Sequence, residues 1–191
     1  MNIDFHSDEN HQKMKEYFLS VCRSDIPISS NIRSHYQKTD LRDAYSVLLP
    51  NSATDDPERL ARHLHENPAP WFHTLLRIRD LLVAPLGIKT SRQFERDAKQ
   101  QKRDHISFFL IFSCYRHEIV YGLDDVHLDF RASVLVVPPS ADSPCRKLVA
   151  VTVVKCHNSL GRLYIRLIAP FHKLAVIGGL RQAAKIGWPA I

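Results

Sequence analysis

Acidic residues are absent from the C-terminal part of the chain, because no Asp or Glu follows Asp142. Eight basic residues do follow it, so this section has a formal charge of +8, which leaves −2 for residues 1–142 in a chain whose net charge is +6. A basic surface can attract an anionic ligand, a phospholipid headgroup or nucleic acid. The alternative is that these residues pair with the acidic front half after folding.

Sequence motifs of catalysis and cofactor binding are also missing. No G-x-G-x-x-G dinucleotide fingerprint and no G-x-S-x-G nucleophile motif occurs, and the four cysteines form no C-x-x-C pair. Cys114 and Cys156 lie in apolar runs, where they are expected to be small buried residues. His63 and His65 are two apart on a predicted helix, so their side chains diverge. We therefore expect no metal and no cofactor.

No uninterrupted apolar run is long enough to predict a transmembrane helix. The longest apolar stretch, residues 163–180, contains two basic residues, one histidine and Pro170. The N-terminus is polar and lacks the apolar core of a signal peptide. A soluble, cytoplasmic protein is therefore expected. Nucleic acid is an unlikely partner, because the basic section has no interleaved aromatic residues apart from Tyr164.

The length and composition predict one domain with a core of its own. The chain has 191 residues, of which 45% are hydrophobic and 24% charged, as in an ordinary globular protein. Residues 1–40 are expected to form a weakly structured extension or a short helix around residues 14–22. Residues 41–187 are expected to form a single α+β domain.

Helices are predicted from their end signals and apolar periodicity. Asp56 followed by Pro57 predicts a helix over residues 58–66, and Pro70 begins a second helix that ends before Gly87. The charged segment 90–104 predicts a solvated loop or a short exposed helix. A long amphipathic helix is expected over residues 159–185, capped by Asn158 or Ser159, with Pro170 kinking or splitting it.

Apolar runs bounded by turn residues predict antiparallel strands. These runs span residues 43–49, 106–114, 117–121, 126–137 and 147–157, with a turn at 122–125. The economical way to bury these elements is a curved antiparallel sheet wrapped around the long C-terminal helix, with two short helices after the first strand. Such a helix-grip-like arrangement often leaves a cavity between the sheet and the helix.

Four segments carry a resemblance to a known family. They read LRDAYSVLLP, PWFHTLLRIRDLLVAPLGIKT, GLDDVHLDFRASV and VVKCHNSLGRLYIRLIAPFHKL, and together they cover roughly residues 31–185. In this order they resemble the bacterial family known as domain of unknown function 2867. The resemblance implies a helix-grip fold akin to the START-like and Bet-v-1-like (SRPBCC) superfamily.

The resemblance also implies a class of ligand. The superfamily binds lipids, sterols and polyketides, and some of its members are cyclases or aromatases. Domains of this family also occur behind an NAD(P)-binding domain, and the missing dinucleotide fingerprint makes this chain a stand-alone version. The family has no settled activity, so the resemblance implies no catalytic residues.

One strand pattern could carry acid–base chemistry. Alternation places His127, Asp129 and Arg131 on one face of a strand. A carboxylate between an imidazole and a guanidinium could fix the tautomer of the histidine and raise its basicity. The alternative is a ladder of cross-strand charges on the outer face of the sheet, because the apolar residues of the strand more naturally face the core.

A second pattern could hold an anionic group. His157 and Asn158 lie at the junction between the last strand and the C-terminal helix, and Arg162 follows one turn later. A helix N-terminus with an arginine nearby can bind a carboxylate or a phosphate. Helix capping by Asn158 explains part of the same pattern without a ligand.

Three functions are compatible with this sequence. The leading one is a module that binds a hydrophobic or amphipathic small molecule in the cavity. The second is a cyclase- or isomerase-type enzyme on the same scaffold, with His127 and Asp129 as acid and base and Tyr164 assisting. The third is an interaction module that docks on an anionic membrane surface or a partner protein through its basic C-terminal section. The residues expected to line the cavity are Trp71, Phe72, Leu75, Leu128, Phe130, Tyr164, Leu167 and Phe171.

Overall fold

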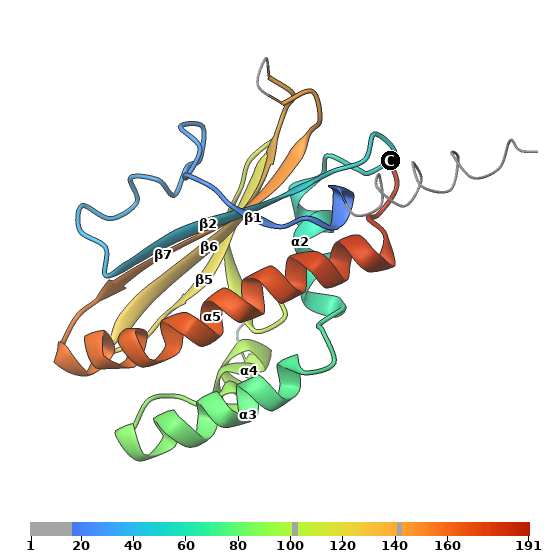
Figure 1. The fold of residues 1–191 in the computed structure, drawn as a ribbon. Coiled ribbons are helices and arrows are strands. Elements are labelled where there is room, and N and C mark those ends of the chain that lie inside the picture. The colour runs from blue at the N-terminus through green and yellow to red at the C-terminus, as the bar shows by residue number, and fades with distance from the viewer. Residues whose placement is uncertain (1–16, 101–102, 141–142) are drawn as a thin grey trace, which may run out of the picture.

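The computed structural model describes residues 17–100, 103–140 and 143–191. Within these ranges, all strands belong to one antiparallel sheet with the order β1-β2-β7-β6-β5-β4-β3 (Figure 1). The strands are β1 (Cys22–Arg23), β2 (Leu41–Leu48), β3 (His105–Ile106), β4 (Phe109–Cys114), β5 (Glu118–Asp124), β6 (Leu128–Val137) and β7 (Lys147–Cys156).

The helices lie on one side of this sheet, and the longest, α5, runs across it (Figure 1). They are α2 (Pro57–Glu66), α3 (Phe72–Val83) with the 3-10 turn η1 (Ala84–Leu86), α4 (Ser91–Gln100) and α5 (Ser159–Ile186). The predicted fold class is therefore confirmed: a curved antiparallel sheet combined with a long C-terminal helix, and two short helices after β2.

Side-chain caps fix where two of the helices begin. The Asp56 carboxylate accepts hydrogen bonds from the backbone N–H groups of Glu58 and Arg59 at the start of α2. At the start of α5, Asn158 Oδ1 accepts from the N–H of Gly161 at 2.9 Å. Both caps agree with the sequence prediction. They satisfy N–H groups that have no partner inside the helix.

The charged segment and the proline-containing segment are both helical. α4 is the exposed helix that was one of the two predicted alternatives for residues 90–104, and none of its residues is buried. α5 continues through Pro170 without a break, so the predicted split does not occur. Proline removes only one backbone hydrogen bond, and packing of both halves of α5 against the sheet side compensates for that loss.

The strand predicted over residues 106–114 is in fact a tight hairpin. β3 and β4 are joined by Ser107 and Phe108, and Ser107 has a φ of 58°. Ser107 is the one polar residue that interrupts the apolar run from Ile106 to Phe112, and a single serine gives little sign of a turn. Cys114, predicted to be buried, is exposed at the end of β4, whereas Cys156 is buried as predicted.

The turn predicted at residues 122–125 begins later than expected. β5 runs through Gly122 to Asp124, and β6 begins at Leu128. A Cβ atom on Gly122 would lie 2.0 Å from the carbonyl oxygen of Phe130 on β6. The glycine therefore permits a close approach of two strands, which is a common role of glycine inside a sheet.

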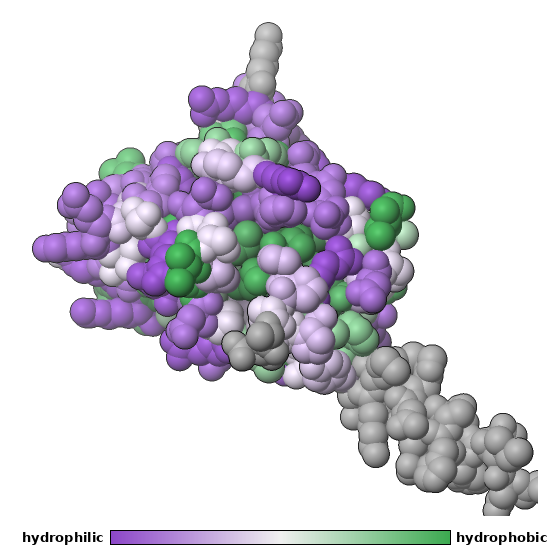
Figure 2. Space-filling model, turned by 90° about the horizontal axis from the view of Figure 1, so that it is seen from above, coloured by the Kyte–Doolittle hydropathy of each residue, from purple (hydrophilic) through white to green (hydrophobic). Residues whose placement is uncertain are grey.

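The N-terminal segment covers the outer face of the sheet. Within residues 24–36, which we call the strap, Ile26 and Ile32 are buried against the valines of the outer face. The sequence predicted weak structure for residues 1–40, but the described part, 17–40, contributes β1 and this strap. The short helix expected around residues 14–22 lies partly outside the described residues. Seen from the side of the strap, the surface is mostly hydrophilic, with only small apolar areas (Figure 2).

A buried carboxylate holds the strap in place. Glu118, at the start of β5, is only 1% exposed. It accepts hydrogen bonds from Ser30 Oγ (2.8 Å), from the backbone N–H of Asn31 (2.6 Å) and from Asn31 Nδ2 (2.8 Å). Three donors compensate for the loss of water around the carboxylate, so the strap and the sheet depend on one another.

We predict that Glu118→Ala destabilises the protein by about 2–4 kcal/mol, because it leaves the buried Ser30 hydroxyl unpaired and removes the part-buried hydrogen bonds to Asn31. Urea unfolding monitored by circular dichroism measures this change. Glu66→Ala, on the exposed end of α2, is the control and should change the free energy of unfolding by less than about 0.5 kcal/mol. Equal stability of the two variants would show that the strap is not anchored by Glu118.

Candidate functional site

A cavity of about 310 Å³ lies between the concave face of the sheet and the helices. α5 and α3 form most of its helical wall, and α2 and α4 contribute at its ends. Its lining is mostly apolar and rich in aromatic rings. The aromatic residues are Trp71, Phe72, Phe94, Phe108, Phe109, Tyr121, Phe130, Tyr164 and Phe171.

Most of the residues predicted to line the cavity do so, and Leu167 does not. The residues found in the lining are Trp71, Phe72, Leu75, Leu128, Phe130, Tyr164 and Phe171. Leu167 lies on the outward face of α5 and is 47% exposed. Phe94 and Phe108 were not predicted. Phe94 is the single aromatic residue of the charged segment, and the two rings stack with centroids 6.2 Å apart.

The difference at Leu167 comes from the choice of helix face. α5 is apolar on more than one side, so periodicity alone cannot say which side faces the sheet. In the structure, Ile165, Leu180 and Ala183 are buried. The outward side carries Leu167 together with two further exposed leucines. The three are Leu163, Leu167 and Leu174, which are 48%, 47% and 56% exposed.

The predicted acid–base residues lie away from the cavity. Asp129 and Arg131 alternate with the cavity-lining Leu128 and Phe130, so they project from the outer face of β6. The Asp129 carboxylate is 3.0 Å from Nε2 of His157 on β7's continuation, and it has no such contact with His127. This arrangement is the charge ladder that was the alternative interpretation of the strand.

Arg131 is held on the same outer face by two contacts. Its guanidinium lies 3.6 Å from the ring centre of Phe112. It also forms an ion pair with Asp124 at 2.6 Å. A nearly buried arginine that stacks on a ring and binds a carboxylate has a sufficient structural role.

The predicted anion site at the start of α5 is not part of the cavity lining. Asn158 caps its own helix and its side-chain amide lies 3.1 Å from Nδ1 of His127. Arg162 is exposed and donates to Ser159 Oγ at 3.3 Å. These contacts serve the junction between sheet and helix, and they leave both groups outside the cavity.

The arginine of the cavity lining is Arg79 on α3. Its guanidinium donates to the Tyr164 hydroxyl at 3.1 and 3.2 Å and to the Lys89 carbonyl at 2.7 Å. It also pairs with Asp80 at 2.9 Å. Burial alone would raise the pKa of Asp80, but hydrogen bonds from Ser91 and Arg79 outweigh it and lower the pKa. Arg79 thus ties α3 to α5 and to the start of α4.

A histidine and a tyrosine form a polar pair at the α2 side of the cavity. His65 Nε2 lies 3.1 Å from the Tyr121 hydroxyl. Burial lowers the pKa of His65 to about 4, and burial raises the pKa of Tyr121. Both groups are therefore neutral at pH 7 and satisfy each other.

A second polar pair was missed by sequence reasoning. His172 of α5 lines the cavity, and its Nε2 is 3.6 Å from Oδ1 of Asp43 on β2. Two signals pointed to them. Asp43 is two residues before the buried Tyr45, so both side chains lie on the same face of the strand. His172 follows the buried Ile165 by seven residues, which is two helical turns, so both lie on the same side of the helix.

Comparison with known proteins identifies the family. The model of the family described as protein of unknown function (DUF2867) matches residues 35–178. The chain belongs to this family. The match covers the sheet from β2 onward, helices α2, α3 and α4, and α5 except for its last turns. For the DUF2867 family, the fold and the cavity described above are therefore the features from which a function can be argued.

Other comparisons add little. No curated protein matches the chain. Among solved structures, the chain is similar to the human StarD13 (DLC2) lipid transfer and protein localization domain, with a TM-score of 0.27 and 10% identity over 96% of this chain and 98% of that one. A likeness this weak carries no argument about function.

The lowered pKa of His65 predicts a pH-dependent stability. Between about pH 6.5 and pH 4 the unfolded chain binds a proton at this histidine and the folded protein does not, so stability falls as the pH falls through this window. The loss should reach about 3 kcal/mol at most. Urea unfolding at pH 7, 5.5 and 4.5 measures it. His65→Gln should flatten this dependence, whereas the exposed His117→Gln should not.

Proposed function

We propose that this DUF2867 protein binds a hydrophobic or amphipathic small molecule in its cavity. The observation that carries the proposal is the cavity of about 310 Å³ lined by aromatic and aliphatic side chains between the sheet and the helices. Small-molecule sites are typically concave, mostly apolar and equipped with a few polar groups. The same architecture supports a place in the START-like superfamily, which is part of the proposal.

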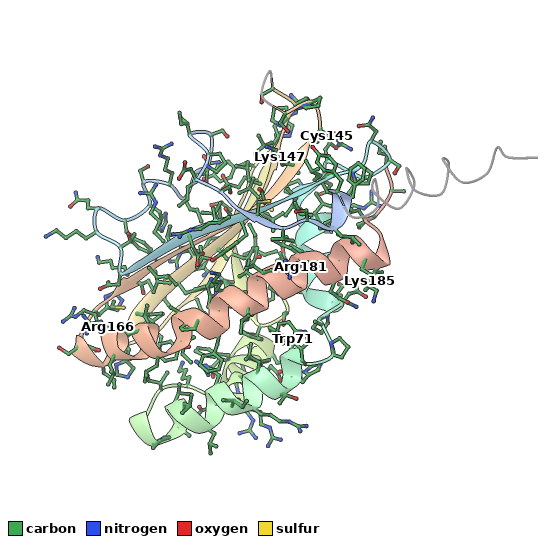
Figure 3. All side chains as sticks on the ribbon, in the orientation of Figure 1. Trp71, Cys145, Lys147, Arg166, Arg181 and Lys185 are labelled. Carbon is green, nitrogen blue, oxygen red and sulfur yellow. The ribbon has the colours of Figure 1, made fainter. Side chains whose placement is uncertain are left out.

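The contact between α3 and α5 supports an access route to the cavity. Val83 is the only buried residue described in α3, so this helix is held by few core contacts. Trp71 lies between the start of α3 and α5 (Figure 3), and a Cβ on Gly178 of α5 would be 2.2 Å from its ring. Outward movement of α3 and Trp71 would open the cavity with little loss of buried surface.

The positions of the charged residues favour binding over catalysis. The cyclase or isomerase alternative requires His127 and Asp129 near the ligand, and neither lines the cavity. A group that moves a proton must come within hydrogen-bonding distance of the substrate. An enzyme on this scaffold would therefore need other residues than those that the sequence suggested.

Filling the cavity should weaken ligand binding. We predict that Ala169→Trp, which places a large ring in the cavity wall, weakens the binding of 1-anilinonaphthalene-8-sulfonate at least about tenfold. Fluorescence titration measures the affinity, and native mass spectrometry of the purified protein tests for a retained natural ligand. Leu167→Trp is the matched control, because it adds the same ring two residues away on the exposed face of α5. Equal affinity of the two variants would rule out the cavity as the binding site.

A second candidate function rests on the outward face of α5. Its exposed leucines at positions 163, 167 and 174 are accompanied by basic residues that Figure 3 shows along the length of the helix, among them Arg166, Arg181 and Lys185. By length and composition, α5 is also the one helix of the described residues that could cross a membrane. Because it packs against the sheet, we propose docking on an anionic membrane surface.

Vesicle binding tests this second function. The protein should co-sediment with vesicles of phosphatidylserine and phosphatidylcholine, and binding should weaken steeply between low and high salt. Leu174→Glu should reduce binding at least about fivefold by placing a charge at the lipid interface. Ile28→Glu, on the strap, is the control and should bind as the wild type does. Equal loss in both variants, or no binding at low salt, would exclude this surface.

A further inference from the structure

The pair formed by Asp43 and His172 is the least satisfied polar feature beside the cavity: His172 is part of the lining, and Asp43 contacts this histidine from β2 without being part of the lining itself. Asp43 lies on β2 opposite Thr152 of β7, which pairs in turn with Ala132 of β6, and both of these line the cavity. Asp43 therefore belongs to the concave face. His172 reaches the same place from α5. The two side chains are 10% and 17% exposed, respectively.

Both side chains have an atom without a hydrogen-bond partner. Oδ1 of Asp43 and Nε2 of His172 are buried, and neither makes a hydrogen bond among the residues that the structure describes. Their separation of 3.6 Å is too long for a hydrogen bond between them. Leaving two buried polar atoms unpaired is unfavourable, and a bound molecule that pairs with both of them would remove this cost.

A structural ion pair is the alternative explanation. A protonated His172 would attract Asp43 at this distance. Buried ion pairs are stable only when the geometry is close and the remaining polar atoms are satisfied. Two other polar groups of the cavity have hydrogen-bond partners: the Arg79 guanidinium has three acceptors, and the imidazole of His65 bonds to the Tyr121 hydroxyl. Among the described residues, Oδ1 of Asp43 and Nε2 of His172 do not.

We propose that Asp43 and His172 bind a hydroxyl group of the ligand. This step rests on the proposed cavity function and adds the class of ligand. A hydroxyl can donate its one hydrogen to Oδ1 of Asp43 and at the same time accept a hydrogen bond from Nε2–H of His172. A ketone, an ester or a hydrocarbon cannot donate to the carboxylate. Compared with these classes, the pair favours an amphipathic alcohol or phenol.

The surroundings of the pair fit the rest of such a ligand. Phe130 lies edge-on to the His172 imidazole, with centroids 6.3 Å apart. Phe130 and Phe171 line the cavity on either side of this histidine, on the sheet and on α5. An apolar body would contact these rings while its hydroxyl reached the Asp43–His172 pair. One desolvated polar contact of this kind discriminates strongly against an analogue that lacks it.

Two probes of nearly the same shape test the proposal. 4-Phenylphenol and 4-methylbiphenyl differ by a hydroxyl in place of a methyl group, and each can be titrated by displacement of 1-anilinonaphthalene-8-sulfonate. The wild type should bind the phenol about tenfold more tightly. Asp43→Leu should reduce this preference to less than about twofold while leaving the affinity for 4-methylbiphenyl unchanged.

Ser46→Ala is the control, because it removes a hydroxyl from the same strand, β2, on the face turned away from the cavity, opposite Val149. It should keep the preference for the phenol. His172→Leu removes the other half of the proposed site and should also lose the preference, which keeps the test valid if Asp43→Leu does not fold. A preference that survives both variants would overturn the proposal.

Thermal unfolding of ligand-free Asp43→Asn separates the two explanations of the pair. A ligand-binding site predicts a melting temperature that is unchanged or higher, because an unpaired buried carboxylate is removed. A structural ion pair predicts a lower one. Equal affinity of the wild type for the two probes would overturn the hydroxyl site alone. Failure of both probes to bind the wild type would count against the cavity function itself.

Discussion

The structure depends on covering a sheet that is apolar on both faces. β6 and β7 read as nearly continuous valine-rich runs and are buried along most of their length, as is typical of strands covered on two sides. α5 and its neighbours cover the concave face, and the strap covers the other. The helices do not fill the concave side completely, because they meet the curved sheet at a distance that aromatic side chains span only in part. The cavity is a consequence of this mismatch.

The polar groups of the cavity differ in how well they are satisfied. Arg79 is surrounded by acceptors and holds α3 to α5, and His65 and Tyr121 are neutral and hydrogen-bonded to each other. Burying polar groups that are satisfied in this way costs little free energy, and their hydrogen bonds make the structure more rigid. Oδ1 of Asp43 and Nε2 of His172, beside the cavity, have no hydrogen-bond partner among the described residues, and this contrast is the basis of the chemistry proposed for the ligand. The apolar rings around them set its bulk.

Much of the fold could be predicted from the sequence, because caps, prolines and alternation act locally. Asp56 and Asn158 define helix starts by contacts with residues two or three positions away. The candidate site could be predicted only in part. Which side of α5 faces the sheet depends on tertiary packing, since Leu167 and Ile165 are equally apolar. The partner of Asp129 depends on strand register, which brings it to His157 and leaves His127 aside.

The two ends of the sheet have a further consequence for how this protein behaves at high concentration. The sheet terminates in β1 and β3, each only two residues long. An exposed sheet edge offers unpaired N–H and C=O groups to another chain, and a very short edge strand offers few of them. A sheet whose interior strands reach ten residues is thus bordered by strands too short to template the addition of a neighbour. Such short edge strands lower the tendency of a large, strongly apolar sheet to add a neighbour along its edge.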